Sequence, residues 1–351
     1  MDSADFVYDY DNYIDYDNIT SSGNVTPEEV HFHFHHNTKC FTEVLCLLFL
    51  VINVIICLLG LGGNGVVIWI AGFGMKRSVN TTWYLSLAVS DFIFCACLPF
   101  NIAYSVMSDW IFGLFMCKFT SFVMFLNMFS SIFLLVIISV DRCVAVVFPV
   151  WAQNHRTVGK ASVLILLAWI ASTALSVPSI VYRDVQNHLG INHCINNYTS
   201  SQYSHEFIAM SRFVFGFVIP FILIIVCYTV IILRLRATQM AKSNKPFKIM
   251  TALILTFFLC WLPYHMFVLI ELNQTFHKEV IILGLKIGTT VAAANSFLNP
   301  VLYVFMGNDF RKKFRSSILS KIENAIGEEG RTISRYLSRS SSVDTRASTH
   351  I

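Results

Sequence analysis

The stretch VLCLLFLVINVIICLLGLGGNGVVIWI, from Val44 to Ile70, contains no charged side chain. A helix of about 20 mainly apolar residues is long enough to cross the hydrocarbon core of a bilayer. No water reaches that core, so a spanning segment must satisfy its backbone N–H and C=O groups internally, as a helix does. The stretch therefore predicts a transmembrane helix.

Six further stretches repeat this pattern, each with at most one charged side chain: Thr81–Tyr104, Phe119–Val140, Ala161–Tyr182, Phe207–Leu233, Ile249–Ile270 and Val280–Met306. The composition agrees, because 55% of the 351 residues are hydrophobic and only 13% are charged. A soluble domain carries about 25% charged residues. We therefore predict an all-α membrane protein, whose residues 41–307 form a seven-transmembrane helix bundle embedded in the lipid bilayer.

Lysine and arginine are distributed unevenly between the two sets of loops. If the N-terminus is extracellular, most of the Lys and Arg residues fall on the inner side, as the positive-inside rule requires. We therefore expect a multi-pass plasma-membrane protein with an extracellular N-terminus. Asn-X-Thr sequons then lie outside, where glycosylation occurs, at Asn18, Asn24, Asn197 and Asn273. The sequon at Asn80 lies inside and should be unused.

Cys117 and Cys194 face the oxidising outer side in this topology. A disulfide between them would hold the second outer loop over the mouth of the bundle. Most other cysteines, Cys46 among them, lie in or against the spans and are predicted to be small buried hydrophobes. Cys40 has no evident partner in the third outer loop.

Residues 1–40 are acidic, with Tyr8, Tyr10, Tyr13 and Tyr16 interleaved among the carboxylates. Such a segment cannot bury enough apolar area to fold alone, but it would attract a basic protein. The tyrosines are candidates for sulfation; the alternative is a merely solvated, glycosylated tail. A short tract of four histidines at residues 31–36 lacks the preset geometry of a site, so we expect no metal there.

The C-terminal residues suggest two further segments. Residues 308–320 combine apolar and basic side chains at spacings that predict a short amphipathic eighth helix on the inner leaflet. Residues 321–351 are predicted to be a disordered tail, with candidate phosphorylation sites at Ser338, Ser340, Ser341, Ser342 and Thr345. A receptor kinase acting there would create an anionic strip for an arrestin; a plain disordered tail is the alternative.

Short motifs stand at fixed places in successive spans: Gly63-Asn64-Gly65-Val66-Val67, Leu87-Ala88-Val89-Ser90-Asp91, Asp141-Arg142-Cys143, Trp169, Pro220 with Tyr228, Phe257 with Cys260-Trp261-Leu262-Pro263, and Asn299-Pro300-Val301-Leu302-Tyr303. Together they resemble the rhodopsin-like (class A) G protein-coupled receptors from about Val44 to Phe314. The resemblance implies that an extracellular ligand activates a heterotrimeric G protein.

Within that class the chain looks most like the chemoattractant group. The segment from Val150 to Val158, VWAQNHRTV, resembles the second inner loop of formyl peptide and chemerin (chemokine-like) receptors. The segment from Asn127 to Leu135, NMFSSIFLL, is closer to chemerin receptors. This resemblance implies a chemerin-like peptide or protein ligand, an inhibitory-class G protein, and a role in leukocyte chemotaxis and inflammation.

The chain departs from formyl peptide receptors at the ligand side. Those receptors carry an acidic residue where Phe125 stands, and an arginine pair of which only Arg212 is present, because Ile208 replaces the other. This disfavours a formyl peptide as the main ligand, although a formyl peptide-type receptor remains an alternative. The second alternative is a non-signalling scavenger of the same ligand. The intact motifs at Asp141-Arg142 and Asn299-Pro300 argue against a scavenger.

Arg212 is the leading candidate for ligand binding. It lies near the outer surface of the fifth span beside Phe213 and Phe215, where an unpaired cation is costly. A ligand carboxylate would stabilise it through charge-assisted hydrogen bonds. Further candidate ligand-binding residues are Arg183, Glu271, Lys118, Lys286, His265 and Asn101.

Asp91 is an ionisable residue at membrane depth and is therefore a functional candidate. The resemblance places around it Asn127, Ser131, Asn295, Ser296 and Asn299, whose oxygens suit an allosteric Na⁺. The alternative is a hydrogen-bonded polar cluster without an ion. We predict no other cofactor.

The resemblance also implies a switch toward the inner side. Arg142 beside Asp141 would pair with a neighbour at rest and turn to Tyr228 and Tyr303 on activation, although it is also a candidate positive-inside anchor. Pro263 and Pro300 interrupt their helices and provide hinges. Trp261, with Phe257, would sense the ligand; the alternative is an ordinary packed aromatic.

Other classes of protein find little support in the sequence. No metal-ligand set, nucleophile–base pair or glycine-rich phosphate loop is visible, so we do not expect an enzyme or a nucleic-acid partner. A retinal protein needs a lysine deep in the seventh span, and Lys286 lies too near its outer end.

Overall fold

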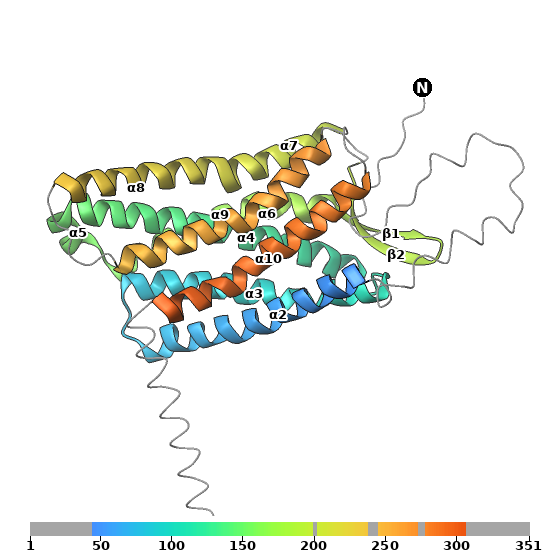
Figure 1. Ribbon diagram of the computed structural model, residues 1–351, viewed down its shortest axis with the longest axis horizontal. Helices are drawn as coiled ribbons and strands as arrows, with labels where there is room; N and C mark the ends of the chain where they lie inside the picture. The colour runs from blue at the N-terminus through green and yellow to red at the C-terminus, as the bar shows by residue number, and fades with distance from the viewer. Residues whose placement is uncertain (1–43, 199–201, 238–244, 273–277, 307–351) are drawn as a thin grey trace, which may run out of the picture.

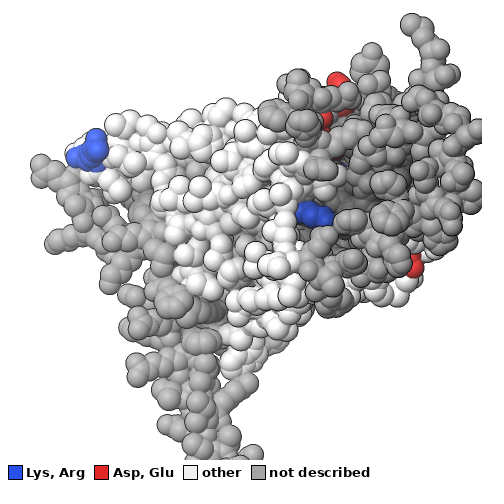
Figure 2. Space-filling model, turned by 45° about the vertical axis from the view of Figure 1, so that its right-hand side comes forward, with Lys and Arg blue, Asp and Glu red and all other residues white. Residues whose placement is uncertain are grey.

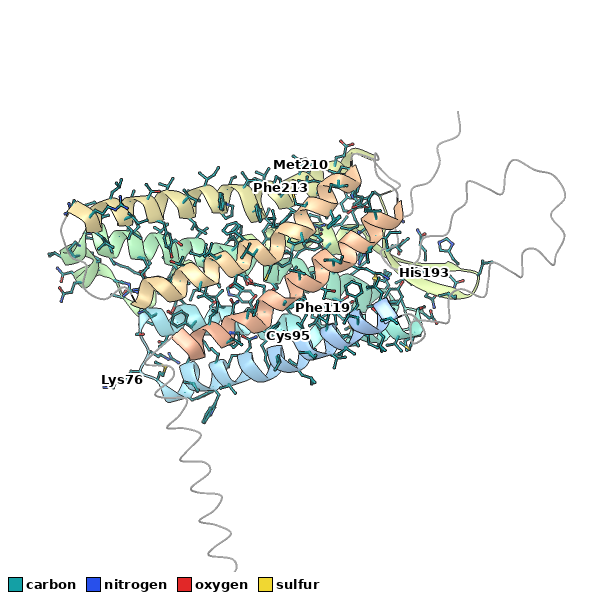
Figure 3. The ribbon with its side chains drawn as sticks, in the orientation of Figure 1. Lys76, Cys95, Phe119, His193, Met210 and Phe213 are labelled. Carbon is teal, nitrogen blue, oxygen red and sulfur yellow. A yellow bond between two sulfur atoms is a disulfide. The ribbon has the colours of Figure 1, made fainter. Side chains whose placement is uncertain are left out.

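The computed structural model describes residues 44–198, 202–237, 245–272 and 278–306. The long helices of this part lie side by side along one axis, with the hairpin β1–β2 at one end and the short helix α5 at the other (Figure 1). We call these the hairpin end and the α5 end. His193 and Lys76 lie toward the two opposite ends (Figure 3).

The described residues contain seven helices that are long and apolar enough to cross a membrane, which confirms the predicted bundle. Two of the seven include a π-helical turn. The elements of the bundle are α2 (Val44–Trp69) with η2 (Ile70–Gly74), α3 (Val79–Met107), α4 (Gly113–Val147), α6 (Val158–Tyr182), α7 (Gln202–Phe213) with η3 (Val214–Val218) and α8 (Ile219–Ala237), α9 (Lys245–Leu272), and α10 (Lys278–Met306).

Apolar side chains cover the outside of the bundle. On α6, for example, Leu164, Leu166 and Ile170 all face outward. On the side of the bundle that Figure 2 shows, the described surface is broadly uncharged and carries few charged side chains. Lipid is as apolar as these side chains, so the helices are held together by close packing and hydrogen bonds rather than by burial from water.

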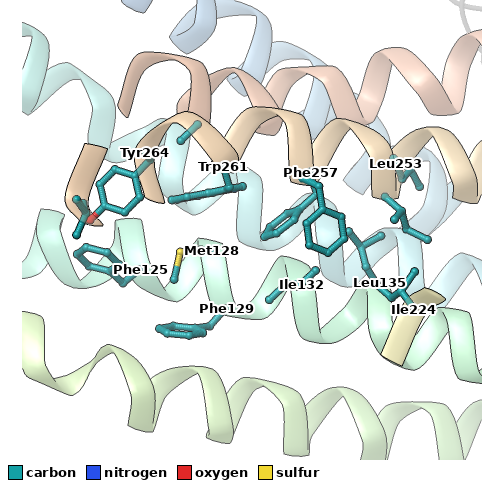
Figure 4. Close-up of a cluster of buried hydrophobic side chains, with 14 of the residues drawn as sticks. Phe125, Met128, Phe129, Ile132, Leu135, Ile224, Leu253, Phe257, Trp261 and Tyr264 are labelled. Carbon is teal, nitrogen blue, oxygen red and sulfur yellow. The ribbon is translucent and has the colours of Figure 1, made fainter. Parts of the chain in front are cut away.

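The largest packed cluster joins α4 to α8 and α9. Side chains of α4 face those of α9 across the bundle axis (Figure 4). Its members include Phe125, Met128, Phe129, Ile132 and Leu135 of α4, Ile224 of α8, and Leu253, Phe257, Trp261 and Tyr264 of α9. Trp261 is only 2% exposed and Phe257 is completely buried, so both lie at the interface between α4 and α9.

Helices α9 and α10 approach each other closely at Gly288. A Cβ atom at Gly288 would lie 2.8 Å from the Cα atom of Tyr264 and 2.9 Å from its backbone nitrogen. Both contacts are with backbone, which cannot move aside as a flexible side chain can. The contact therefore requires glycine, and it lies next to Pro263.

The hairpin consists of β1 (Arg183–His188) and β2 (Ile191–Asn196), paired antiparallel with Val185 opposite Cys194. Its turn, Leu189-Gly190, has positive φ at both residues, as a two-residue type I′ turn requires. The predicted disulfide between Cys117 and Cys194 is confirmed, with Cα atoms 5.6 Å apart. It attaches β2 to the first turn of α4.

Several features differ from the sequence predictions. The short helix α5 (Pro149–His155) was not predicted, although Pro149 at its first position is a typical helix start. The helices also extend beyond the apolar stretches, because their polar ends can reach the membrane surface. Cys46 was predicted to be a small buried hydrophobe, but it is disulfide-bonded.

Several predictions concern parts of the chain that the structure does not describe. These are the acidic tail 1–40, the amphipathic helix 308–320, the tail 321–351 with its phosphorylation sites, and the sequons at Asn18, Asn24 and Asn273. They stay predictions, as does glycosylation of Asn197, whose side chain donates to the carboxylate of Asp184 at 3.2 Å.

Candidate functional site

Arg212 lies at the C-terminal end of α7, directly before Phe213, which Figure 3 labels in the half of the bundle toward the hairpin end. Its guanidinium carbon is 3.5 Å from the centre of the Phe125 ring on α4, a cation–π contact. One terminal nitrogen donates to Ser179 Oγ of α6 at 2.9 Å. The sequence suggested an unpaired cation, but these two neighbours hold it. The Nε atom is buried and has no hydrogen-bond partner among the described residues.

Two more buried polar side chains stand on α9: His265, within electrostatic range of Arg212, and Glu271, which like Arg212 lies within electrostatic range of Tyr198. His265 is 2% exposed and Glu271 is 6% exposed. Within the described ranges, His265 Nε2 and Glu271 Oε2 have no hydrogen-bond partner. The His265 ring lies among the aromatic rings of Phe213 and Phe217, with centroids 5.7 and 5.3 Å away. Both groups therefore retain hydrogen-bonding capacity that an entering molecule can use.

Tyr198, in the segment after β2, lies within electrostatic range of Arg212 and Glu271. Burial raises the pKa of its phenol, while the nearby positive charges of Arg212 and Arg183 oppose this shift. Its ring packs against His205 at 4.7 Å and Tyr182 at 5.3 Å. We call Arg212, Ser179, His265, Glu271 and Tyr198 the outer polar cluster. Sequence reasoning gave neither Ser179 nor Tyr198 a role in ligand binding.

The remaining candidate ligand residues are less directly connected. Arg183 begins β1 and lies within electrostatic range of Tyr198. Lys118 on α4 and Lys286 on α10 are half-buried, and Asn101 on α3 is exposed. No hydrogen bond or ion pair that the structure describes joins Lys118 or Asn101 to the outer polar cluster. Their roles, like that of Lys286, stay predictions.

Asp91 is completely buried in the middle of the bundle, and both of its carboxylate oxygens accept hydrogen bonds. Its two carboxylate oxygens accept from Asn127 Nδ2 on α4 and Asn299 Nδ2 on α10, each at 2.8 Å. Ser296 Oγ in turn donates to Asn127 Oδ1 at 3.4 Å. The structure thus brings side chains of α3, α4 and α10 together around one carboxylate, as the resemblance implied.

Two further buried oxygens, on residues one helical turn from Asn127 along α4 and from Asn299 along α10, have no partner in the part of the chain that the structure describes. Ser131 Oγ and Asn295 Oδ1 are buried, and their residues are each 1% exposed. A buried oxygen without a donor is unfavourable unless a water or an ion satisfies it. Together with the Asp91 carboxylate, these hard oxygen donors are the type that Na⁺ prefers, so the residues present fit the ion.

The arrangement at the α5 end differs from the simple pair that the sequence suggested. Asp141 accepts two hydrogen bonds from Arg156, the residue after α5: Nε to Oδ1 at 2.7 Å and Nη2 to Oδ2 at 2.8 Å. The neighbouring Arg142 is farther away, with Nε 3.9 Å from Oδ2. Arg142 instead donates to the side-chain oxygen of Asn80 on α3. The sequence flagged Asn80 only as an unused sequon.

The other predicted switch residues lie between these two ends. Phe257 and Trp261 are neighbours on α9, with ring centroids 6.1 Å apart. Pro263 and Pro300 lie inside α9 and α10, which continue as helices on both sides. Tyr228 accepts a hydrogen bond from Thr251 at 3.4 Å. The side chain of Tyr303 lies outside the described part, so its role stays a prediction.

The buried carboxylate of Asp91, the packed Trp261 and Arg142 at the α5 end all lie in one stretch of the chain that matches a known family. Residues 63–303 match the family described as "7 transmembrane receptor (rhodopsin family)". The chain belongs to this family. As a rhodopsin-family receptor it is a class A G protein-coupled receptor and a multi-pass membrane protein, and it is not an enzyme.

Individual relatives place the receptor in the chemoattractant group. It is 45% identical to human chemerin-like receptor 1 over 306 residues, which cover 82% of each chain. It is 39% identical to the C3a anaphylatoxin chemotactic receptor of Oncorhynchus mykiss over 322 residues, 89% of this chain and 86% of the relative. Mouse formyl peptide receptor 2 is 37% identical over 309 residues, 82% and 88% of the two chains.

Proposed function

We propose that this receptor binds a chemerin-like peptide or protein and signals through an inhibitory-class G protein in leukocyte chemotaxis and inflammation. In this proposal the hairpin end and the N-terminus face the outside of the cell, and the α5 end faces the cytoplasm. The positive-inside distribution of Lys and Arg supports this orientation, since both arginines of the Asp141 site lie at the α5 end. The disulfide-tethered hairpin fits an oxidising outer side.

The observation that carries the ligand assignment is the outer polar cluster. Arg212 Nε, His265 Nε2 and Glu271 Oε2 are buried without partners among the described residues, in an otherwise aromatic surround. The C-terminal carboxylate of a peptide would take the free donor of Arg212, and donors of the same peptide would reach Glu271. Lys118, Lys286, Arg183 and Asn101 would contact the rest of the ligand.

A chain of packed side chains connects the outer polar cluster to the middle of the bundle, so a bound ligand can act on residues there. His265 contacts the Trp261 ring at a centroid distance of 6.4 Å, and Trp261 packs against Phe257. A shift at His265 therefore presses on both aromatics below it. Pro263 lies between Trp261 and His265 in α9 and removes one backbone hydrogen bond, which lets the two halves of α9 change their relative tilt.

Na⁺ would bind to Asp91, Ser131 and Asn295, with Asn127 and Asn299 fixing the carboxylate. When bound, the ion would neutralise the buried charge and link α3, α4 and α10 in the resting arrangement. These oxygens would hold the helices together, so ion binding and agonist binding would oppose each other.

The cytoplasmic partner would contact the α5 end. Val150 and Trp151 on α5 are 73% and 54% exposed, close in the chain to Asp141 and Arg142. Large exposed apolar side chains beside charged groups are typical of protein interaction sites. We assign this surface to the G protein, with Tyr228 and Tyr303 receiving Arg142. Phosphorylation of the tail by a receptor kinase would recruit arrestin.

Arg212→Ala tests the ligand assignment. Binding of a labelled peptide with the C-terminal sequence of chemerin is measured as the free acid and as the C-terminal amide. The wild type should prefer the acid by about tenfold or more, because the charged pair forms in a partly desolvated site. The variant should bind acid and amide equally. Ser162→Ala, whose exposed hydroxyl donates to Val158 O near the start of α6, away from Ser179, is the control. Equal preference in the wild type would contradict the assignment.

A scavenger is the main alternative function, and a formyl peptide-type receptor is the second. Chemerin is added to cells that express the receptor, and inhibition of forskolin-stimulated cAMP is measured. Pertussis-toxin-sensitive inhibition supports the proposal. Uptake of chemerin without any cAMP response would favour the scavenger, and a response to N-formyl peptide alone would favour the second alternative.

A further inference from the structure

The carboxylate of Asp141 is bound by a residue fifteen positions later in the chain. Arg156 approaches it as a fork, with Nε and Nη2 each donating to a different oxygen, at 2.7 and 2.8 Å. A planar guanidinium matches a carboxylate in this way, and the two parallel bonds fix its orientation. The Arg156 side chain is 27% exposed and that of Asp141 is 13% exposed, so the pair is largely shielded from water.

Arg142 is the other cation beside this carboxylate. Because Arg156 already bonds both carboxylate oxygens, Arg142 forms no hydrogen bond with Asp141. Its Nε is 3.9 Å from Asp141 Oδ2, beyond hydrogen-bond distance. Its Nη2 donates instead to Asn80 Oδ1, which also accepts from Arg156 Nη2 at 2.5 Å. One amide oxygen on α3 thus connects both guanidiniums. Tyr84, one turn later on α3, lies within electrostatic range of both.

We infer that Arg156 is a positioning residue for G-protein coupling: it occupies Asp141 and leaves Arg142 held by the neutral Asn80. A neutral acceptor holds a guanidinium less strongly than a carboxylate does. Arg142 is therefore restrained weakly at rest and turns readily toward the partner. The inference rests on the proposed coupling to a G protein, and it assigns the restraint to a residue outside the Asp141-Arg142 motif.

The same contact orients α5. Arg156 directly follows this helix, and its backbone N–H donates to Ala152 O at 2.9 Å. Ala152 is buried, whereas Val150 and Trp151 are exposed. The fork to Asp141 consequently fixes which face of α5 the partner meets. One arginine thus sets both the freedom of Arg142 and the presentation of the apolar surface.

Basal guanine-nucleotide exchange on a purified inhibitory-class heterotrimer tests the inference, with equal amounts of folded receptor in nanodiscs. In Arg156→Ala, Asp141 becomes available to Arg142, so exchange should fall about fivefold. In Asn80→Ala, Arg142 loses its acceptor while Arg156 still occupies Asp141, so exchange should rise about fivefold. Arg156→Lys should lie between Arg156→Ala and the wild type, because an ammonium cannot form the fork.

Lys160→Ala is the matched control, since it removes a nearby exposed cation whose side chain takes no part in the Asp141 site. It should leave exchange unchanged. Arg156→Ala with unchanged or raised exchange would overturn the inference, as would Asn80→Ala that leaves exchange unchanged or lowers it. Opposite signs for the two variants cannot arise from general misfolding.

A second measurement does not depend on signalling. In receptor labelled with ¹⁵N-arginine, the Nε–H resonance of Arg142 is assigned by its loss in Arg142→Lys. It should shift in Arg156→Ala, as Arg142 moves onto Asp141, and stay in place in Lys160→Ala. An unmoved resonance in Arg156→Ala would overturn the inference. A wild type that fails to promote exchange even with chemerin contradicts the proposed function instead, and the resonance still tests the inference.

Discussion

At the residue scale, the receptor places a few polar groups inside an apolar bundle, and in the described part each has a specific partner or an atom with unused hydrogen-bonding capacity. Asp91 is bound by two amide donors, whereas Ser131 Oγ and Asn295 Oδ1, one helical turn from those donors, lack partners among the described residues. Arg212 is held by an aromatic face and a hydroxyl but keeps a free donor. Such groups are costly in a membrane, so we expect their removal to alter ligand or ion binding.

Asp91→Asn should abolish the sensitivity of agonist binding to sodium. In the wild type, replacing Na⁺ by N-methylglucamine at constant ionic strength should raise the affinity for the chemerin peptide, because the ion no longer stabilises the resting arrangement. In Asp91→Asn the affinity should be the same in both salts. Competition binding measures this, and a sodium-insensitive wild type would rule out the ion site.

Phe125→Leu should remove the cation–π contact that positions Arg212, while leucine still fills most of the apolar space. The cation–π contact at 3.5 Å is lost, and such contacts contribute about 0.5–2 kcal/mol. We expect the affinity for the acid form of the peptide to change by less than it does in Arg212→Ala. If Phe125→Leu matched the loss in Arg212→Ala, the aromatic face rather than the charge would be the main ligand contact.

The residues of this site were only partly predictable. Arg212, Glu271 and His265 were chosen because a polar residue inside a span has few explanations, and the structure brings them together. Ser179 and Tyr198 could not be found, since a serine in a span or a tyrosine in a loop has many ordinary roles. Likewise Asp141 next to Arg142 suggested a pair, but adjacent residues on a helix diverge in direction, and Arg156 approaches the carboxylate better.

At the element scale, the helices were predictable and their irregularities were not. Each apolar stretch produced a helix, because a bilayer leaves the backbone no other choice. The π-helical turns at Ile70–Gly74 and Val214–Val218 left no mark in the apolar pattern, which is hydrophobic on every face there. The helix α5 was missed because it is short and carries apolar side chains on its exposed face.

Gly288→Val tests the close contact between α9 and α10. The added side chain would meet the backbone of Tyr264, so the two helices must separate beside Pro263. We expect destabilisation of about 1–3 kcal/mol, read as a lower apparent Tm in detergent at a fixed heating rate. Gly62→Ala is the control, because a Cβ there meets nothing within 4 Å. Equal Tm values for both variants would contradict the packing described here.

At the scale of the whole molecule, the receptor connects a ligand site at the hairpin end with the Arg142 region at the α5 end. The hairpin end holds the outer polar cluster and the strand β2, which the Cys117–Cys194 disulfide tethers to α4, and the α5 end holds Arg142. Between them lies the continuous packed cluster of α4 and α9 that contains Trp261 and Phe257. A tightly packed cluster has discrete arrangements rather than a continuous range, so a change at one end can select an arrangement at the other.

The most direct test of this connection is ligand-dependent nucleotide exchange by the purified receptor in nanodiscs. The C-terminal chemerin peptide and an inhibitory-class heterotrimer are added together, and exchange is compared with that without peptide and with that of Arg212→Ala. The account predicts that the peptide accelerates exchange in the wild type and has little effect in Arg212→Ala at the same peptide concentration. Saturating binding of the peptide to the wild type, with no acceleration of exchange, would contradict it.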